Sequence, residues 1–192
     1  EGDAECLFGD LPVPAETRQD NSIVCVSPAA NQGRTRLTVR SLLSGEPVPS
    51  AEAFTFWSAP SVYRVYPKTS LALGPVPVTV TITGAHFVSS NALMCSFGDL
   101  PVAARWMSPN AMECTAPNRS AGIVSVAVSN NGVDWAHGLD TFSYVPATTL
   151  HSILPTNGSI SGGTRVNLFG TNFPLSEFSQ LYCAFGNQLT EA

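Results

Sequence analysis

The chain has 192 residues, 44% of them apolar and only 12% charged, and its formal net charge is −5. With so few charges, Ser, Thr, Asn and backbone groups must supply much of the surface. The negative balance argues against nonspecific attraction to nucleic acid or acidic membranes, because neutralising phosphate needs clustered Lys and Arg. Fifteen Gly and fifteen Pro interrupt the chain, and no long run shows helical spacing of apolar residues. This composition predicts an all-β protein.

A motif near the start of the chain returns twice. Residues 6–13 (CLFGDLPV) match residues 95–102 (CSFGDLPV) at an offset of 89, and residues 183–187 (CAFGN) follow after a further 88. The chain therefore contains a repeat of roughly 88 residues.

The repeat frame predicts three domain segments. We expect the C-terminal part of a first repeat at 1–58, a complete second repeat at 59–146 and the N-terminal part of a third at 147–192. The connectors at 57–60 and 145–147 are short and contain proline, so neighbouring domains are expected to form a stiff rod. No stretch approaches the roughly 18 apolar residues of a membrane span, so any targeting signal or anchor is expected outside this fragment.

The cysteines fit the same frame. Cys25 follows Cys6 by 19 residues, and Cys114 follows Cys95 by the same spacing, whereas the mate expected for Cys183 falls beyond the chain end. We predict Cys6–Cys25 and Cys95–Cys114 disulfides, each closing a loop of about twenty residues and stabilising its domain by about 3 kcal/mol. The alternative is reduced, buried cysteines in an intracellular protein. Zinc is disfavoured because CxxC pairs are absent.

Alternating apolar and polar residues predict strands in each copy of the repeat. Residues 78–83 alternate aliphatic side chains with threonine, residues 124–129 alternate valine with small residues, and the pairs at 37 and 39 and at 166 and 168 reproduce the inward faces. Turn signals recur about every ten residues. Short strands within a repeat of about 90 residues fit a two-sheet sandwich of immunoglobulin size.

One predicted strand carries a basic stripe. Arg34, Arg36 and Arg40 fall on the face opposite Leu37 and Val39. The stripe is a candidate contact for an acidic glycan or for a partner's carboxylates. The alternative is an ordinary solvated face.

Three tryptophans are candidates for recognition. Trp106 and Trp135 could serve as partner anchors or as stacking platforms for sugar, the alternative being core or strand-edge positions. Trp57 lies at a connector and is expected to fill a domain junction.

Two N-glycosylation sequons fall in predicted loops, Asn118-Arg119-Ser120 and Asn157-Gly158-Ser159. Their number is what chance would give in a chain of this composition. Their placement in loops favours modification of Asn118 and Asn157 in a secreted protein.

Nothing in the sequence predicts catalysis. There is no G-x-S-x-G motif, the three histidines stand in unrelated contexts, and the acidic pair Asp134 and Asp140 is explained by a solvated loop. No glycine-rich phosphate loop and no metal-ligand spacing occurs. We expect a protein that is not an enzyme and has no cofactor and no metal.

Residues 153–173 (ILPTNGSISGGTRVNLFGTNF) closely resemble the opening of an IPT/TIG domain, with the pattern P-x-x-G-x-x-x-G-G-T followed by G-x-x-F. The C-x-F-G and C-x-x-P pair resembles the disulfide-bearing form found in plexins, the hepatocyte growth factor receptor family and fibrocystin-like surface proteins. The second repeat departs from the pattern, with Leu73-Gly74-Pro75 where Gly-Gly-Thr is expected.

The resemblance implies tandem immunoglobulin-like sandwiches of the early-set type. It implies a non-enzymatic structural or adhesion module of an extracellular or cell-surface protein, made in the secretory pathway. Its expected partners are other protein chains or neighbouring repeats of the same protein, with glycan as a further candidate and no nucleic acid or membrane contact. Two alternatives stay open: an accessory carbohydrate-binding module of a secreted glycosidase, and an intracellular TIG dimerisation module.

Overall fold

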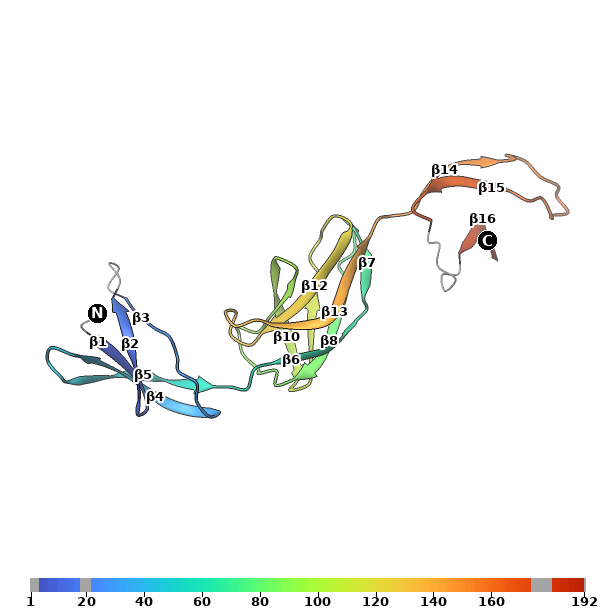
Figure 1. Ribbon diagram of the computed structural model, residues 1–192. Helices are drawn as coiled ribbons and strands as arrows, with labels where there is room; N and C mark the ends of the chain where they lie inside the picture. Colours follow the sequence, from blue (N-terminus) through green and yellow to red (C-terminus); the bar gives the residue numbers. More distant parts are fainter. Residues whose placement is uncertain (1–3, 18–21, 174–180, 192) are drawn as a thin grey trace. The chain divides into compact units, whose positions relative to one another are not determined.

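The computed structural model describes residues 4–17, 22–173 and 181–191, and β-strands are the regular elements of these ranges (Figure 1). The chain divides into two compact units, Glu1–Ala59 and Pro60–Ala192. Within the described ranges there is no helix of the length and hydropathy needed to cross a membrane. The prediction of an all-β fold is confirmed.

The first unit is one five-stranded antiparallel sheet in the order β3-β2-β1-β4-β5. Its strands are β1 (Ala4–Phe8), β2 (Leu11–Thr17), β3 (Ile23–Cys25), β4 (Gly33–Ser41) and β5 (Pro47–Phe56). Cys6 and Phe8 are buried on one face, where Leu37 and Val39 pack against them. The Phe8 ring meets the Phe54 ring edge to face at 5.0 Å, an arrangement that the quadrupoles of aromatic rings favour. The alternation of β4 therefore places its aliphatic residues inward.

The segment that follows, from β6 to β13, is a sandwich of eight strands. They are β6 (Ser61–Tyr66), β7 (Thr69–Leu71), β8 (Thr79–Ala85), β9 (Met94–Phe97), β10 (Leu100–Ser108), β11 (Ala111–Thr115), β12 (Gly122–Ser129) and β13 (Ala136–Val145). Their order is β6-β8-β11-β10-β9-β12-β13-β7. Strand β10 pairs with β9 through residues 100–103 and with β11 through residues 104–108. It therefore passes from one sheet of the sandwich to the other.

The core of this repeat lies between the two sheets. Val80 and Ile82 of β8 and Val126 and Val128 of β12 have no exposed surface, because period-two alternation turns these side chains inward. The ring of Phe142 packs edge to face between Phe97 and Tyr144, at centroid distances of 5.2 Å and 5.1 Å. Burying one such side chain stabilises a fold by about 1.5–3 kcal/mol.

A close backbone crossing recurs in the second and third repeats. The Cβ of any larger residue at Gly84 would lie 1.9 Å from the carbonyl oxygen of Ser61, and at Gly170 it would lie 2.0 Å from that of Thr149. Two residues on, His86 and Asn172 have φ angles of 62° and 58°. The G-x-x-F pattern thus marks a place where only glycine fits and where the next turn is left-handed.

The third repeat contributes two short antiparallel pairs, β14 with β15 and β16 with β17. Their bounds are Thr149–Leu154, Asn167–Thr171, Tyr182–Phe185 and Gln188–Glu191. Between β14 and β15, Gly162 has a φ of 79°. Leu73, in the Leu-Gly-Pro segment of the second repeat, has a φ of 51°. Leu73 therefore adopts the left-handed backbone conformation that Gly162 adopts in the third repeat.

Candidate functional site

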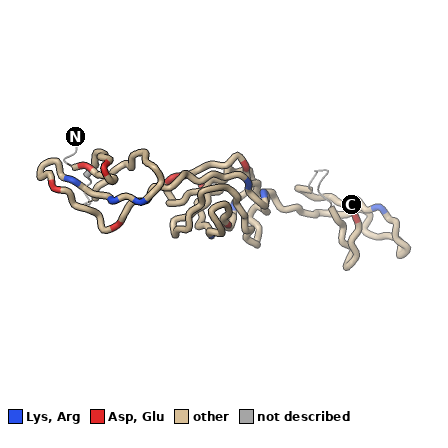
Figure 2. Tube along the Cα trace, turned by 90° about the horizontal axis from the view of Figure 1, so that it is seen from below, with Lys and Arg blue, Asp and Glu red and all other residues tan. Residues whose placement is uncertain are grey.

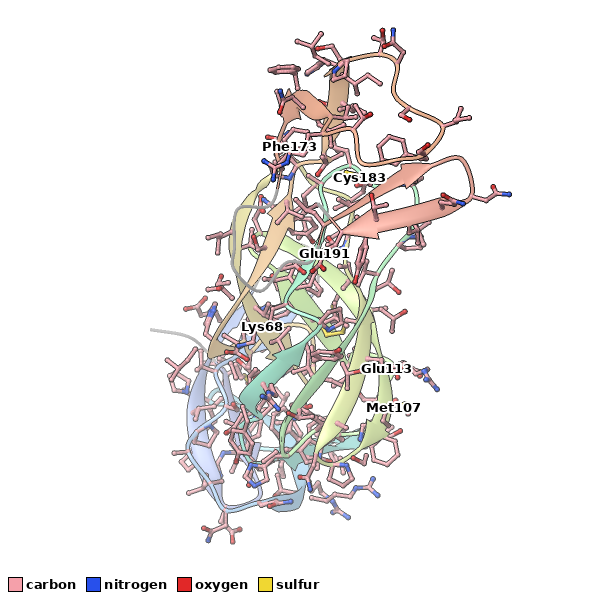
Figure 3. The ribbon with its side chains drawn as sticks, turned by 90° about the vertical axis from the view of Figure 1, so that its right-hand side faces the viewer. Lys68, Met107, Glu113, Phe173, Cys183 and Glu191 are labelled. Carbon is pink, nitrogen blue, oxygen red and sulfur yellow. A yellow bond between two sulfur atoms is a disulfide. The ribbon has the colours of Figure 1, made fainter. Side chains whose placement is uncertain are left out.

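The cysteines pair as the repeat frame predicts. Disulfides join Cys6 to Cys25 and Cys95 to Cys114, with Cα–Cα distances of 6.3 Å and 6.4 Å. Because Cys95 is on β9 and Cys114 on β11, the second bond links the two strands that flank β10, at the point where β10 changes sheet. Cys183, labelled in Figure 3, is a free thiol in the described part of the chain.

Asp140, one of the acidic pair considered for acid–base chemistry, is held within the fold by hydrogen bonds. Its carboxylate accepts a hydrogen bond from the Val65 backbone N–H at 3.0 Å and from the Lys68 Nζ at 2.6 Å. The Lys68 hydrogen bond, helped by the Val65 N–H, lowers the pKa of Asp140 below its ordinary value. Asp140 therefore ties β13 to β6. Asp134 accepts a hydrogen bond from Asn131 at 2.8 Å and belongs to the loop before β13.

The hydrogen bonds of Asp140 predict that the wild type loses stability in acid more steeply than a variant without this carboxylate. A carboxyl whose pKa is lowered on folding contributes stability above its unfolded pKa and loses that contribution as the pH falls through the folded value. As the pH drops below the ordinary aspartate pKa of 3.8, we expect the unfolding free energy of Asp140→Asn to fall less steeply than that of the wild type. Urea titrations at a series of pH values between about 5 and 2 would measure this. Lys68→Met should flatten the curve in the same way, and parallel curves for wild type and both variants would contradict the prediction.

Trp106 is tied into the fold. Its indole N–H donates to the Phe87 carbonyl oxygen at 3.0 Å, which leaves 38% of the residue exposed. Asn130, 6% exposed, holds the same loop from the other side. Its Nδ2 donates to the His86 carbonyl oxygen at 2.9 Å, and its Oδ1 accepts from the Val88 N–H at 3.1 Å. Trp106 and Asn130 together fix the left-handed turn at His86.

Small residues form a row across the outer face of one sheet. Pro101 of β10 is paired with Ser96 of β9, Ser96 with Ala127 of β12, and Ala127 with His137 of β13. This row alternates with the core positions of the same strands and so lies on the outer face. Even so, Ala127 is only 3% exposed and Ser96 only 8%. Neighbouring side chains must therefore cover the row.

Trp135 stands beside the row. It is half-buried and lines a shallow hollow of about 310 Å³, here called the outer-face hollow. The residues that line it are Ser96, Gly98, Asp99, Pro101, Ala127, Trp135 and His137. Its floor is made of small side chains and one of its walls is an aromatic ring. Such a surface suits insertion of a partner's side chain.

An ion pair lies beside the outer-face hollow. The Arg119 Nη1 donates to the Asp99 carboxylate at 2.5 Å and to the Phe97 carbonyl oxygen at 2.7 Å. The Arg119 hydrogen bond lowers the pKa of Asp99 below its ordinary value. Asp99 is therefore a fixed anion at the edge of the hollow, while His137 is exposed at the other end of the row.

The basic stripe of β4 consists of two exposed cations and one paired cation. Arg40 forms an ion pair with Glu5, which faces it on β1. Arg34 and Arg36 are exposed. Figure 2 shows how sparse charged residues are along the chain. The positive charge available to a partner on β4 therefore lies at Arg34 and Arg36.

Both predicted glycosylation sites lie in exposed loops. Asn118 lies between β11 and β12, and Asn157 between β14 and β15. A large hollow of about 710 Å³ near Asn157 is lined by Ile153, Val166 and Phe185 among others. In the repeat frame these three correspond to Val65, Val80 and Phe97, which are core residues of the complete repeat. We therefore regard this hollow as part of a domain interior.

The described residues contain no group of three or more His, Cys, Asp or Glu side chains placed to hold a metal ion.

A family model described as IPT/TIG domain matches residues 60–144 and 148–192. The chain belongs to the IPT/TIG family. The chain is similar to Fibrocystin-L of Homo sapiens, 34% identical over 96 residues, and of Mus musculus, 30% identical over 96 residues. Each alignment covers 49% of this chain and 2% of the relative, so the chain spans a very small part of those proteins.

The fold is shared with the extracellular region of a plexin. The solved structure of the Plexin A4 full extracellular region, domains 1 to 10, matches 96% of this chain and 16% of that chain, with a TM-score of 0.50 and 18% identity. A glucan-utilization protein of Bacteroides ovatus, SGBP-B in complex with a mixed-linkage heptasaccharide, covers 76% of this chain and 38% of that chain at 14% identity. Its TM-score of 0.35 is too low to support any argument about sugar binding.

The floor of the outer-face hollow was not predicted from the sequence. Trp135 was a candidate, whereas Ser96 and Ala127 were not, because small residues on a polar face carry no signal by themselves. A comparison of the repeats would have supplied a signal, because the first unit has larger residues at these two positions. Leu7 and Thr38 stand at the corresponding positions of the first unit, where they are paired with each other.

Proposed function

We propose that this chain is a non-enzymatic structural and adhesive segment of an extracellular or cell-surface protein, in which tandem IPT/TIG repeats present a surface for other protein chains. The observation that carries the proposal is the outer-face hollow of the complete repeat. Interfaces are commonly anchored by an aromatic side chain beside a pocket that excludes water. Trp135 and the row of small residues supply both parts.

The domain organisation that we propose is the one expected from the repeat frame, with segments at 1–58, 59–146 and 147–192. The IPT/TIG matches at 60–144 and 148–192 support the second and third segments. We further propose that the short proline-containing connectors keep successive repeats stiff. A stiff array would hold the hollow at a defined distance from its neighbours.

An extracellular location is part of the proposal. The disulfides Cys6–Cys25 and Cys95–Cys114 support it, because such bonds persist in oxidising compartments. The plexin structure with the same fold is an extracellular region. An intracellular TIG dimerisation module would be expected to keep these thiols reduced. The disulfides therefore favour the extracellular alternative.

Protein contact is favoured over sugar binding by the geometry of the tryptophans. A sugar platform needs an open ring face with hydrogen-bonding groups at its rim. Trp106 uses its N–H within the fold, and Trp135 is half-buried. Asp99 is already engaged by Arg119. These groups suit a side-chain anchor better than a saccharide.

Trp135→Ala tests this proposal. The full chain, immobilised through one end, would be probed with purified ectodomains, with further repeats of the same protein and with a glycan array. We expect a protein partner whose affinity falls at least about tenfold in Trp135→Ala, the usual loss at an aromatic anchor. Equilibrium binding by surface plasmon resonance measures the loss.

Tyr63→Ala is the matched control. Tyr63 is 69% exposed on β6 and does not line the outer-face hollow, so its loss removes an exposed aromatic ring elsewhere on the same repeat. Its binding should equal that of wild type. Equal binding by all three proteins would overturn the role of the hollow. Capture of glycan with no protein partner would favour the carbohydrate-binding alternative.

A further inference from the structure

The sequon at Asn118 has its three residues on different sides of the loop. Asn118 and Ser120 are exposed, whereas Arg119 between them is half-buried. The Arg119 guanidinium donates inward to Phe97 and Asp99, and its carbonyl oxygen accepts from the Leu73 N–H at 2.9 Å. The central residue therefore anchors the loop while the two residues that define the sequon face solvent.

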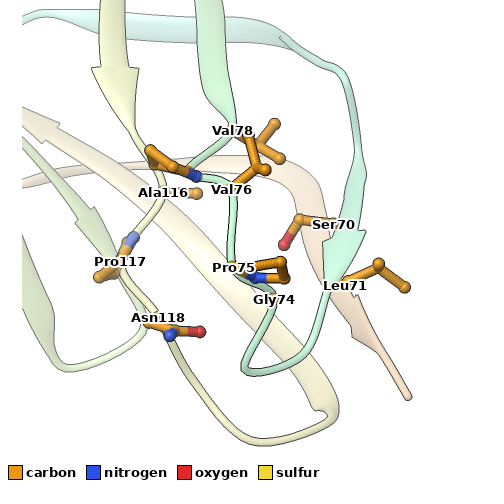
Figure 4. Close-up of a pocket in the computed structure, with 10 residues that line it drawn as sticks. Ser70, Leu71, Gly74, Pro75, Val76, Val78, Ala116, Pro117 and Asn118 are labelled. Carbon is orange, nitrogen blue, oxygen red and sulfur yellow. The ribbon is translucent and has the colours of Figure 1, made fainter. Parts of the chain in front are cut away.

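Beside Asn118 lies a hollow of about 160 Å³, here called the Asn118 hollow (Figure 4). Its lining includes Ser70 and Leu71 of β7 and Pro75 and Val76 from the segment between β7 and β8. Leu71 is 51% exposed and Val76 is 74% exposed. Leu71 and Val76 therefore give the hollow an exposed apolar rim beside the polar side chains of Ser70 and Asn118.

Two rim residues, Pro75 and Val76, lie in or next to the segment in which the second repeat departs from the family pattern. The third repeat has Gly162-Gly163-Thr164 in its first loop, whereas the second has Leu73-Gly74-Pro75 followed by Val76. Leu73 takes a φ of 51°, in a left-handed region that is sterically unfavourable for a non-glycine residue. The second repeat therefore has an apolar loop in an unfavourable backbone conformation, and this loop lies beside the Asn118 sequon.

We propose that Asn118 carries an N-linked glycan whose first N-acetylglucosamine lies in the Asn118 hollow and covers Leu71, Pro75 and Val76. The donor is a polyprenyl diphosphate oligosaccharide. The bond between the anomeric carbon and the diphosphate oxygen breaks, and the diphosphate leaves with the bonding electrons. A bond forms from Asn118 Nδ2 to the anomeric carbon, and Nδ2 gives up one proton. The sugar's apolar ring face and acetyl methyl then meet the rim, and Ser70 contributes a hydroxyl.

Occupancy is tested on the full chain secreted from a glycosylating eukaryotic cell line. Peptide N-glycosidase should convert Asn118 to Asp, a change that peptide mass spectrometry detects. Asn118→Gln and Ser120→Ala should each remove the glycan from this peptide, whereas Asn157→Gln should leave it in place. Unmodified Asn118 in the secreted wild-type chain would overturn the proposal.

The position of the first sugar is tested by trimming. An endoglycosidase that leaves one N-acetylglucosamine on Asn118 should preserve the midpoint of thermal unfolding. Complete removal should lower it by about 4 °C, a shift typical of losing a modest contact in a domain of this size. In Val76→Ser, which removes one apolar side chain of the rim, the difference between the two midpoints should shrink. Equal midpoints for both treatments in wild type would show that the glycan does not pack in the hollow.

Discussion

Gly84→Ala is expected to lower the unfolding free energy of the second repeat by about 3 kcal/mol, the upper end of what overpacking costs. The new methyl carbon would lie 1.9 Å from the Ser61 carbonyl oxygen and 2.5 Å from the Phe87 ring. Ser61 lies on β6 and is paired with Ala85 of β8, so the oxygen cannot move without disturbing the pairing of these strands. Phe87 is 3% exposed and is held in the core.

Urea unfolding of the full chain, followed by tryptophan fluorescence, would measure this loss, because two of the three tryptophans lie in the second repeat. Thr83→Ala is the matched control. Thr83 lies next to Gly84 on β8, and its side chain is exposed, so the change should stay within about 0.5 kcal/mol. A Gly84→Ala chain as stable as the control would show that the crossing of β6 and β8 can widen at little cost.

The local pattern was sufficient to predict the strands. Val80, Ile82, Val126 and Val128 are all buried, because alternation with period two is a property of the strand itself. The self-similarity of the chain predicted the cysteine pairs for a similar reason. Each pair is repeated at the same spacing, so one copy supports the interpretation of the other.

Non-local contacts could not be predicted in this way. The segment Asn130-Asn131-Gly132 reads as a turn, and Gly132 does have a φ of 74°. The role of Asn130 in holding His86 and Val88 depends on a contact across more than forty residues. The passage of β10 from one sheet to the other could not be predicted either. The sequence of a continuous strand does not show that its pairing changes from β9 to β11. Burial of Ser96 and Ala127 on an outer face also depends on the side chains that cover them.

The Cys95–Cys114 bond is expected to contribute as much as the Gly84 crossing. It closes a loop with a sequence separation of 19, and removing the constraint from the unfolded chain should cost about 3 kcal/mol. Both cysteines are buried, at 0% and 2% exposed, so replacement by alanine also leaves unfilled space. The bond further joins the strands on either side of β10. The double change Cys95→Ala with Cys114→Ala should therefore lower the unfolding free energy by at least that amount.

The double change is preferred because a single one would leave a new free thiol, which could attack the Cys6–Cys25 disulfide in the unfolded chain. Urea unfolding measures the effect, and Cys183→Ala is the control, since its thiol is free and its loss should change stability little. Thiol counting on the unfolded, non-reduced wild-type chain should find one reactive cysteine. Five reactive cysteines together with an unchanged unfolding free energy in the double variant would contradict both the bond and the extracellular location proposed from it. A single reactive cysteine together with unchanged stability would show instead that the packed core alone holds β10 between its two sheets.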